Sequence, residues 1–218
     1  MDAERLPAAI RAAAGDRRGG ATEVAARALD GLLEVADDPR LLEAAVAALL
    51  AGQPAMAPVW HLARAARGPR PRDALVALRA RLDPDAEEAV DAAAGWLRPR
   101  LAGGGRGAVA TVSHSSLVDR VLARLGPAAG EAPPVAGLVG ADAIGPEAFL
   151  NAAGTGELAA RLPTLVVATD VKLLPAAAFA RLGGPGFEAV PLAAVAAVVL
   201  GREVLSPAGA GRRARSVG

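Results

Sequence analysis

The hydrophobic pattern of this chain changes at the glycine-rich run 101–107, and this change constrains the fold more than any other feature of the sequence. Before the run, apolar residues recur at helical spacing and no segment alternates with period two. After it, short β-compatible runs alternate with helical patterns. Because a glycine-rich segment is flexible by composition, we predict a helical domain over residues 1–100 and an α/β ligand-binding domain over residues 106–207.

The amino-terminal half predicts a set of consecutive helices, which Gly, Pro and Asp residues separate from one another. Taken alone, this pattern is typical of any helical bundle. The expected helices are Ala3–Ala14, Ala21–Ala36, Pro39–Ala51, Ala55–Ala66, Arg72–Arg81 and Pro84–Leu97.

The carboxyl-terminal half predicts an α/β fold. The candidate strands are Ala108–Ser113, Val135–Val139 and Leu165–Thr169, each followed by polar or glycine residues and then by a helical pattern. Strands that alternate with helices imply a small, mostly parallel sheet covered on its faces. Ligands of such sheets bind beyond the carboxyl ends of the strands, so the polar residues that follow the strands are the candidates for a site.

Composition excludes several kinds of site. With 53% hydrophobic but only 2% aromatic residues, the core is built from Ala, Val and Leu. The chain has no cysteine, which rules out disulfides, thiolate nucleophiles and Cys-ligated metals. With two histidines we expect no metal site, and no cofactor. A net charge of +1 gives no field that attracts nucleic acid or a membrane.

The sequence also carries expectations about location. The first residues form a charged amphipathic stretch without the order of a secretory signal, and the apolar run Ala189–Leu200 falls short of the ~20 residues that span a bilayer. We therefore predict a cytoplasmic protein. Residues 208–218 predict a flexible basic tail, and the Ala, Gly, Arg and Pro bias is typical of a GC-rich bacterial genome.

An ordered set of short motifs resembles the alpha, beta and delta regulatory subunits of translation initiation factor 2B. Each motif is weak alone, but together they cover most of the chain in the order of that family. They are GGATEVAARAL (Gly19–Leu29), QPAMAPVWHL (Gln53–Leu62), VSHSSLVDRVL (Val112–Leu122), LVGADAIGPEAFLNAAGTGELA (Leu138–Ala159), VVATDVKLLP (Val166–Pro175) and FEAVP (Phe187–Pro191).

The resemblance implies a domain like that of ribose-5-phosphate isomerase and CoA transferases, and a superfamily that includes ribose-1,5-bisphosphate isomerase and methylthioribose-1-phosphate isomerase. Proton shuttling in those enzymes is assigned to a Cys and to the Asp of a Gly-Ala-Asp motif. The resemblance places the Asp at Asp142 and the Cys position at Ser113. A serine hydroxyl titrates far above the physiological range, so Ser113 does not replace the thiol unaided, although the imidazole of His114 is a candidate to help it.

The sequence departs from the family pattern in three further places. Between the first strand and Gly-Ala-Asp the family has two more strands and helices, where this chain has only Ala123–Pro134. We therefore expect a narrower sheet. The Lys of the family's Asn-Lys-x-Gly-Thr pattern is Ala152 here, and the Arg before Gly-Ala in the helical half is Gly19.

The candidate site residues fall into a catalytic set and a ligand-binding set. If the protein is an enzyme, the resemblance makes Asp142, Ser113 and His114 catalytic. We expect Asp142, Asn151 and Thr155 to converge on one cleft, with Ser113 and His114 facing them. The expected ligand-binding residues are Gly20, Ser115, Ser116, Asp142, Asn151, Gly154, Thr155 and Lys172.

Each of these assignments has a structural alternative. Asp142 also fits a turn residue that bonds the local backbone. The helix start at Gly154 and Thr155 suits a phosphate or an ordinary Thr N-cap. Lys172 suits either an anionic ligand or a solvated loop. For Glu23 and His61 the structural reading is favoured.

These observations favour a protein that binds a phosphorylated sugar or nucleotide as a non-catalytic sensor or interaction module. The alternatives are an aldose–ketose isomerase of a small phosphosugar and a regulator of translation initiation. We also expect a homodimer formed mainly through the α/β half, because the segment Ala189–Leu200 is too apolar to stay exposed as a patch.

Overall fold

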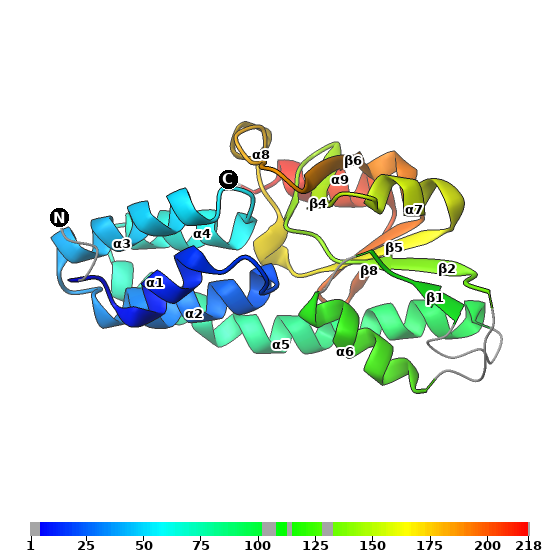
Figure 1. Cartoon of the computed structure of the whole chain (residues 1–218), viewed down its shortest axis with the longest axis horizontal. Coiled ribbons are helices and arrows are strands. Elements are labelled where there is room, and N and C mark those ends of the chain that lie inside the picture. Colours follow the sequence, from blue (N-terminus) through cyan, green and yellow to red (C-terminus); the bar gives the residue numbers. More distant parts are fainter. Residues whose placement is uncertain (1–4, 102–107, 113–114, 128–132, 218) are drawn as a thin grey trace.

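The computed structural model describes residues 5–101, 108–112, 115–127 and 133–217, and it places a helical part beside an α/β part (Figure 1). The helical part contains α1 (Ala8–Gly15), α2 (Ala21–Glu34), α3 (Pro39–Gly52), α4 (Ala57–Ala66) and the first half of α5 (Pro71–Leu97). The long α5 runs beneath both parts (Figure 1).

The helices of the first part pack closely because small residues lie where they touch. The core holds Ile10, Leu29, Leu49 and Leu75 among many buried alanines. A Cβ at Gly52 would lie 2.3 Å from the carbonyl oxygen of Ala14, so only glycine allows the end of α3 to approach α1 at this point. A core without aromatic residues thus gains its packing from short distances between helices.

One predicted helix boundary is wrong, because a single helix runs through Pro84 where the sequence predicted a break at Asp83. Proline inside a helix costs about 3 kcal/mol. Packing on both sides offsets this cost: Leu82 belongs to the core of the helical part, and Ala86 and Ala89 belong to the core beneath the sheet. The tertiary contacts therefore override the local preference of proline.

The α/β part contains two sheets. The larger has the strand order β1-β2-β5-β7-β8 and is parallel except for its last strand. The smaller is antiparallel with the order β3-β4-β6. The bounds are β1 (Val109–Ala110), β2 (Ala136–Val139), β3 (Ala143–Ile144), β4 (Ala148–Ala152), β5 (Thr164–Ala168), β6 (Phe187–Pro191), β7 (Ala197–Leu200) and β8 (Glu203–Leu205).

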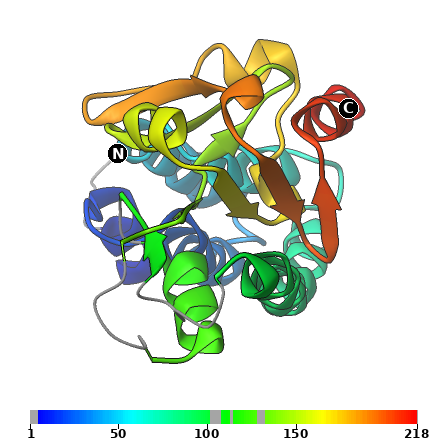
Figure 2. The same cartoon turned by 90° about the vertical axis from the view of Figure 1, so that its right-hand side faces the viewer.

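Helices and the smaller sheet cover the two faces of the larger sheet (Figure 2). The second half of α5 and α6 (Ser116–Leu125) pack on one face, while α9 (Pro207–Arg215) and the smaller sheet pack on the other. Short helices connect these elements: α7 (Thr155–Arg161), α8 (Ala176–Phe179) and the 3₁₀ turns Arg98–Arg100, Asp170–Lys172 and Leu192–Ala194. The predicted fold class, a helical region followed by a small, mostly parallel α/β sheet, is confirmed.

The division of the chain between residues 100 and 106 stays a prediction. In the structure, the second half of α5 shares one apolar core with α6 and strands of the larger sheet. The packing of the two parts therefore changes near the middle of α5, upstream of the glycine-rich run.

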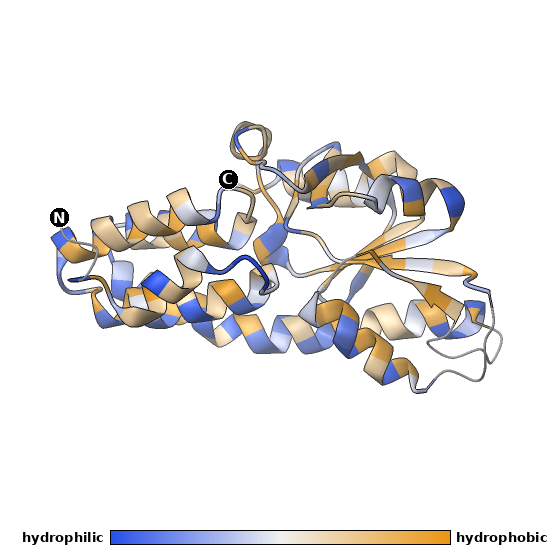
Figure 3. Cartoon of the chain, in the orientation of Figure 1, coloured by the Kyte–Doolittle hydropathy of each residue, from blue (hydrophilic) through white to orange (hydrophobic). Residues whose placement is uncertain are grey.

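The apolar segment Ala189–Leu200, on which the homodimer prediction rests, is buried in part within the chain itself. Its final residues form the buried strand β7, in which Val198 and Val199 are 0% exposed, whereas Ala193 and Ala194 before it are exposed. The reason given for a homodimer is therefore weakened, although the dimer itself stays a prediction. Figure 3 shows the strands of the larger sheet mainly in apolar colours, whereas apolar and polar residues alternate along the helices.

The carboxyl-terminal segment is a helix, where the sequence predicted a flexible tail. In α9, the hydroxyl of Ser206 accepts a hydrogen bond from the backbone N–H of Gly209 at 3.2 Å. Ala210 and Ala214 are buried against the sheet, and Arg213 forms an ion pair with Asp170 at 3.3 Å. The alanines between the arginines give this helix an apolar face, which the count of basic residues conceals. Among the residues described, every helix is too short or too polar to span a bilayer.

Candidate functional site

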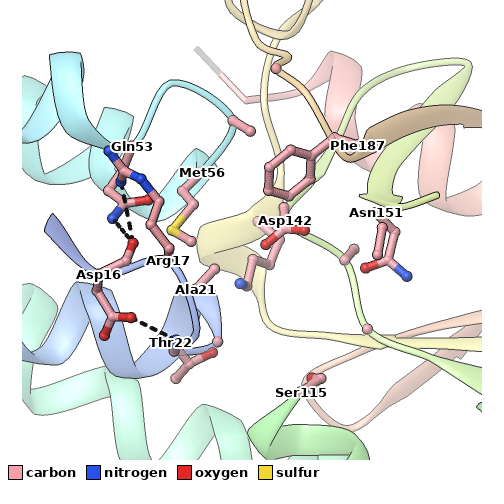
Figure 4. A pocket seen from close by; sticks show the side chains of 18 of the residues that line it. Asp16, Arg17, Ala21, Thr22, Gln53, Met56, Ser115, Asp142, Asn151 and Phe187 are labelled. Atoms are coloured by element: carbon pink, nitrogen blue, oxygen red, sulfur yellow. Dashed lines mark hydrogen bonds between the residues drawn. The ribbon is translucent and has the colours of Figure 1, made fainter. Parts of the chain in front are cut away.

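A cavity of about 770 Å³ lies between the helical part and the α/β part (Figure 4). Its α/β wall is formed by residues that follow β2 and β5 directly, at the carboxyl edge of the parallel sheet where such folds bind ligands. Its helical wall is formed by the loop before α2 and the segment before α4. The residues that line the cavity include Asp16, Gly20, Gln53, Ser115, Ser116, Gly140, Asp142, Asn151, Lys172 and Phe187.

Lys172 lies in the 3₁₀ turn directly after β5, and its side chain lines the cavity although the residue is only 3% exposed. Among the described residues, none forms a hydrogen bond or an ion pair with its amino group. Burial lowers the pKa of Lys172 to about 8, because desolvation penalises the charged form, and the charge of Asp142 opposes this shift in part.

Asp142 follows β2, and its backbone is fixed by both parts of the molecule. Its N–H donates to the carbonyl oxygen of Leu150 at 2.9 Å, and its own carbonyl accepts a hydrogen bond from the N–H of Ala57 at 2.9 Å. Burial raises the pKa of the Asp142 carboxyl above its usual range, and Lys172 opposes this rise. The cavity therefore holds a carboxyl group and an amine that are both less ionised than in water.

Two helix amino ends meet at the same cavity. α2 begins after Gly20 and α6 begins after Ser115, and neither residue caps its helix with a side-chain hydrogen bond. A Cβ at Gly20 would lie 3.5 Å from the backbone nitrogen of Ser116, so the two helix starts lie side by side. The first N–H groups of a helix lack partners within the helix and carry its positive dipole end. This arrangement suits an anion.

Gly140 brings the loop after β2 close to the start of α6. A Cβ at this position would lie 2.7 Å from the hydroxyl oxygen of Ser115, which is too close, so a residue other than glycine would force Ser115 to move. The glycine thus positions the Asp142 loop against the helix start.

The helical wall depends on two residues that the site prediction did not include. The Asp16 carboxylate accepts hydrogen bonds from the N–H groups of Gly19 (2.8 Å) and Arg18 (2.9 Å), and it pairs with Arg27 at 2.8 Å. The backbone hydrogen bonds from Gly19 and Arg18, together with Arg27, lower the pKa of Asp16 to about 2. An Asp that bonds the backbone a few residues on is a recognisable turn signal, so the sequence did contain a sign of this loop.

The buried side chain of Gln53 fixes the same loop from the other side. Its amide donates to the carbonyl oxygens of Ala13 at 2.7 Å and Asp16 at 2.6 Å. No local pattern signals these contacts, because they join segments that are far apart in the sequence.

The structure brings six of the predicted site residues together. Ser113 and His114 lie outside the described residues, so their place in the site stays a prediction. The residues that line the cavity are Gly20, Ser115, Ser116, Asp142, Asn151 and Lys172.

Gly154 and Thr155 are not among the residues that line the cavity. Thr155 is 0% exposed, and its hydroxyl donates to the carbonyl oxygen of Ala152 at 2.7 Å and accepts from the amide of Asn151 at 2.9 Å. The N–H of Gly156 donates to the Glu188 carboxylate at 2.7 Å. The amino end of α7 is thus partnered by β6, and Thr155 serves to position Asn151.

His61 has a structural place, as expected. Its Nε2 lies 2.8 Å from the carbonyl oxygen of Leu173, and burial lowers the pKa of its imidazole. Within the described ranges, no group of His, Asp or Glu side chains is arranged to hold a metal ion.

The composition of the chain singles out Lys172. The chain has 24 basic residues, of which Lys172 is the only lysine. A chain that uses arginine at every other basic position keeps its one lysine in the wall of the cavity.

Comparisons with known proteins define the class of fold. The sequence matches no protein-family model and no curated relative. The structure is similar to translation initiation factor eIF-2B of Pyrococcus horikoshii, with 19% identity, a TM-score of 0.71, and coverage of 94% of this chain and 98% of that chain. It is also similar to the eIF2B beta2-delta2 complex of C. thermophilum, with 12% identity, a TM-score of 0.62, and coverage of 94% and 91%.

A third similar structure is an enzyme, the 5-methylthioribose 1-phosphate isomerase of Pyrococcus horikoshii. It shares 16% identity at a TM-score of 0.54, over 94% of this chain and 85% of that chain. The protein therefore has the fold of initiation factor 2B subunits and of this isomerase, as the motifs predicted. At these identities the likeness concerns the fold.

Proposed function

We propose that this protein binds a phosphorylated small molecule, a sugar phosphate or a nucleotide, in the cavity between its two parts. One observation carries the proposal: the uncapped starts of α2 and α6 lie side by side at the cavity that the buried Lys172 lines. In the proposed complex, the N–H groups of both helix starts hold the phosphate. Asp142 and Asn151 then face the hydroxyl groups of the sugar.

The protein acts in this proposal as a sensor or interaction module without turnover. Binding and catalysis draw on different residues, and the chain has no cysteine to supply the thiol that the resemblance assigns to proton transfer. The proposal includes a homodimer, which light scattering at high micromolar concentration tests; a monomer there would remove the dimer and leave the ligand site untouched.

The second candidate is an aldose–ketose isomerase of a small phosphosugar. The raised pKa of Asp142 favours it, because burial brings the pKa of this carboxyl group closer to the range in which a general acid or base works. The similar fold of 5-methylthioribose 1-phosphate isomerase favours it as well.

A thermal-shift panel of phosphosugars and nucleoside monophosphates tests the binding proposal. A ligand at about 100 times its Kd stabilises the folded state by about 2.7 kcal/mol. For a chain of this size, that corresponds to a rise of several degrees in Tm, at roughly 2–4 °C per kcal/mol. A flat panel contradicts the proposal.

Gly20→Asp is the sharpest variant for this panel. Its carboxylate would cap α2 from within the chain and repel a phosphate, and the space at Gly20 accepts a Cβ. We expect the variant to keep its Tm and to lose the shift with ligand. The matched control is Ser206→Asp at the start of α9, remote from the cavity, which should keep the full shift.

A coupled turnover assay with ribose-1,5-bisphosphate and methylthioribose-1-phosphate separates the two candidates. We expect ligand binding without turnover. Turnover that disappears in Asp142→Asn would overturn the sensor and establish the isomerase.

A further inference from the structure

Binding of an anion does not by itself explain why a lysine occupies position 172. A cation that only pairs with phosphate can be an arginine, and arginine occupies every other basic position of this chain. Arginine is better suited to the bidentate pairing of phosphate, but its guanidinium stays protonated in proteins. Lysine differs from it in one chemical respect: a buried lysine loses its proton readily and becomes a nucleophile.

The surroundings of Lys172 favour the uncharged amine. The residue is 3% exposed, and within the described part of the chain no carboxylate forms an ion pair with it. Burial lowers its pKa to about 8, so about a tenth of the amine is unprotonated at pH 7, a far larger share than for an exposed lysine. Lys172 is nevertheless among the residues that line the cavity.

The remaining groups of the cavity suit two different ends of a ligand. Ser115 and the other residues at the starts of α2 and α6 suit a phosphate, as proposed above. Asp142 interacts with Lys172 electrostatically, and its carboxyl group has a raised pKa. Condensation of an amine with a carbonyl group needs a neighbouring group that can give and take a proton, and a carboxyl group can do this.

We propose that Lys172 forms a reversible imine with the aldehyde carbon of the bound ligand, which makes the ligand class a phosphorylated aldehyde, such as an open-chain aldose phosphate. The proposal rests on the proposed phosphate-binding function of the same cavity. It narrows that function, because a nucleotide has no free aldehyde with which to react.

The step balances without an oxidant or a reductant. The nitrogen of Lys172 adds to the carbonyl carbon, and the carbonyl oxygen takes a proton from Asp142 while the nitrogen returns one to it. The hydroxyl of this adduct then takes a proton from Asp142 and leaves as water, while the nitrogen lone pair forms the C=N bond. The protonated imine returns its proton to the Asp142 carboxylate. Water reverses the reaction, so the adduct releases the unchanged aldehyde.

Reductive trapping tests the proposal on the full chain. The protein is incubated with ribose 5-phosphate or glyceraldehyde 3-phosphate and sodium cyanoborohydride, and the adduct is located by intact mass and peptide mapping. We expect one adduct per chain, at Lys172. Lys172→Arg and Lys172→Met should both fail to form this adduct. Two variants are used so that misfolding of one of them does not decide the result. Trapping at the amino terminus alone overturns the proposal.

An engineered surface lysine provides the reference rate. Arg202→Lys in the Lys172→Met background places an ordinary amine in the exposed turn after β7. We expect Lys172 in the natural chain to be trapped at least about tenfold faster than this lysine, because its neutral fraction is larger at pH 7 by the difference in pKa. Equal rates would mean that Lys172 is an ordinary amine and overturn the proposal.

A matched pair of ligands separates failure of the imine from failure of the phosphate site. Ribose 5-phosphate and ribitol 5-phosphate differ in the aldehyde that only the first can expose. We expect both to shift Tm, and the aldehyde to do so at a lower concentration. Equal shifts without trapping overturn the imine and leave the phosphate site. Shifts with neither ligand overturn both.

Discussion

Helix starts in this protein are of two kinds, and the difference between them points to the cavity. α3 begins at Asp38, whose carboxylate accepts hydrogen bonds from the N–H groups of Arg40 and Leu41 at 3.0 and 3.1 Å. α9 begins at Ser206 with a similar bond. By contrast, α2 and α6 begin at Gly20 and Ser115 without such a bond. Of these four helices, the two that begin away from the cavity have a side-chain cap and the two that begin beside it have none.

An open start is not diagnostic by itself. The helices α1, α5 and α8 also begin without a side-chain cap, away from this cavity, and α4 begins without one after Met56, which lines it. The starts of α2 and α6 differ because they lie against each other and line a cavity together with a buried amine. The comparison therefore teaches that a missing cap has meaning only where a second, independent group faces the same space.

The largest expected effect comes from removing the buried amine. Lys172→Met should raise the free energy of unfolding at pH 7 by roughly 3 kcal/mol, because a pKa of about 8 in place of 10.5 measures the cost of burying the charge. Urea unfolding measures this. The matched control, Arg202→Met on the surface, should change little. If Lys172→Met were less stable than the natural chain, Lys172 would stabilise the fold. The buried amine would then no longer mark the cavity as a binding site, and the open helix starts beside it would have no special meaning.

The pH dependence of stability follows from the same group. Between pH 8 and 10.5 the unfolded chain binds the Lys172 proton and the folded chain does not, so the free energy of unfolding should rise with pH over this window. The chain has no Cys and no Tyr, and Lys172 is its only lysine, so no other side chain of those types titrates there. Urea titrations at several pH values check the rise, which should be absent from Lys172→Met.

A smaller effect is expected where the helical wall is fixed. Asp16→Ala removes the acceptor for the N–H groups of Gly19 and Arg18, and we expect a loss of about 1–2 kcal/mol together with weaker ligand binding. The depressed pKa of Asp16 adds a pH signature: its contribution is present above pH 4 and is lost as pH falls toward about 2. Chemical unfolding at pH 7 and pH 3 measures both. Unchanged binding in this variant would separate the loop from the site.

The smallest changes in stability are expected from two variants that alter helix starts, one remote from the cavity and one beside it. Asp38→Ala should cost about 1 kcal/mol and leave ligand binding intact, whereas Gly20→Asp should change stability by only a few tenths of a kcal/mol and abolish binding. Thermal shift with and without ligand reads both quantities. If Asp38→Ala weakened binding as much as Gly20→Asp did, the two kinds of helix start would not differ in function.

The fold was predictable from the sequence because its main signal is periodic. The change from helical to strand patterns gave the two kinds of structure, and the runs at β2 and β5 appeared within a residue or two of their positions. The strands β3, β4, β6, β7 and β8 were not among the predicted strands. β3 and β8 are too short to show a period, and β7 is buried along its whole length, so it has no alternating pattern. The helix through Pro84 was missed because its cause is packing against two cores, which no local pattern contains.

The candidate site was predictable in part, for a similar reason. Asp142 and Lys172 follow strands, so the topology of a parallel sheet places them at one edge. Thr155 was assigned to the ligand because its helix start looks free in the sequence, whereas Glu188 reaches that helix from a distant strand. Contacts between distant segments decide which polar residues are free to meet a ligand.

The helix α5 has a consequence for how such a chain can be divided by recombination. A gene fragment that begins after the glycine-rich run would encode the sheet without the helix that covers one of its faces, and it would expose the apolar residues that α6 and the strands share with α5. A fragment that ends at the run would carry the second half of α5 with nothing to cover it. A junction at the short connection between Ala66 and Pro71 keeps α5 with the sheet, but it removes Leu75 and Leu82 from the core of the helical part. Because α5 contributes to both cores, a helical part taken from a relative would have to pack on the first half of this α5.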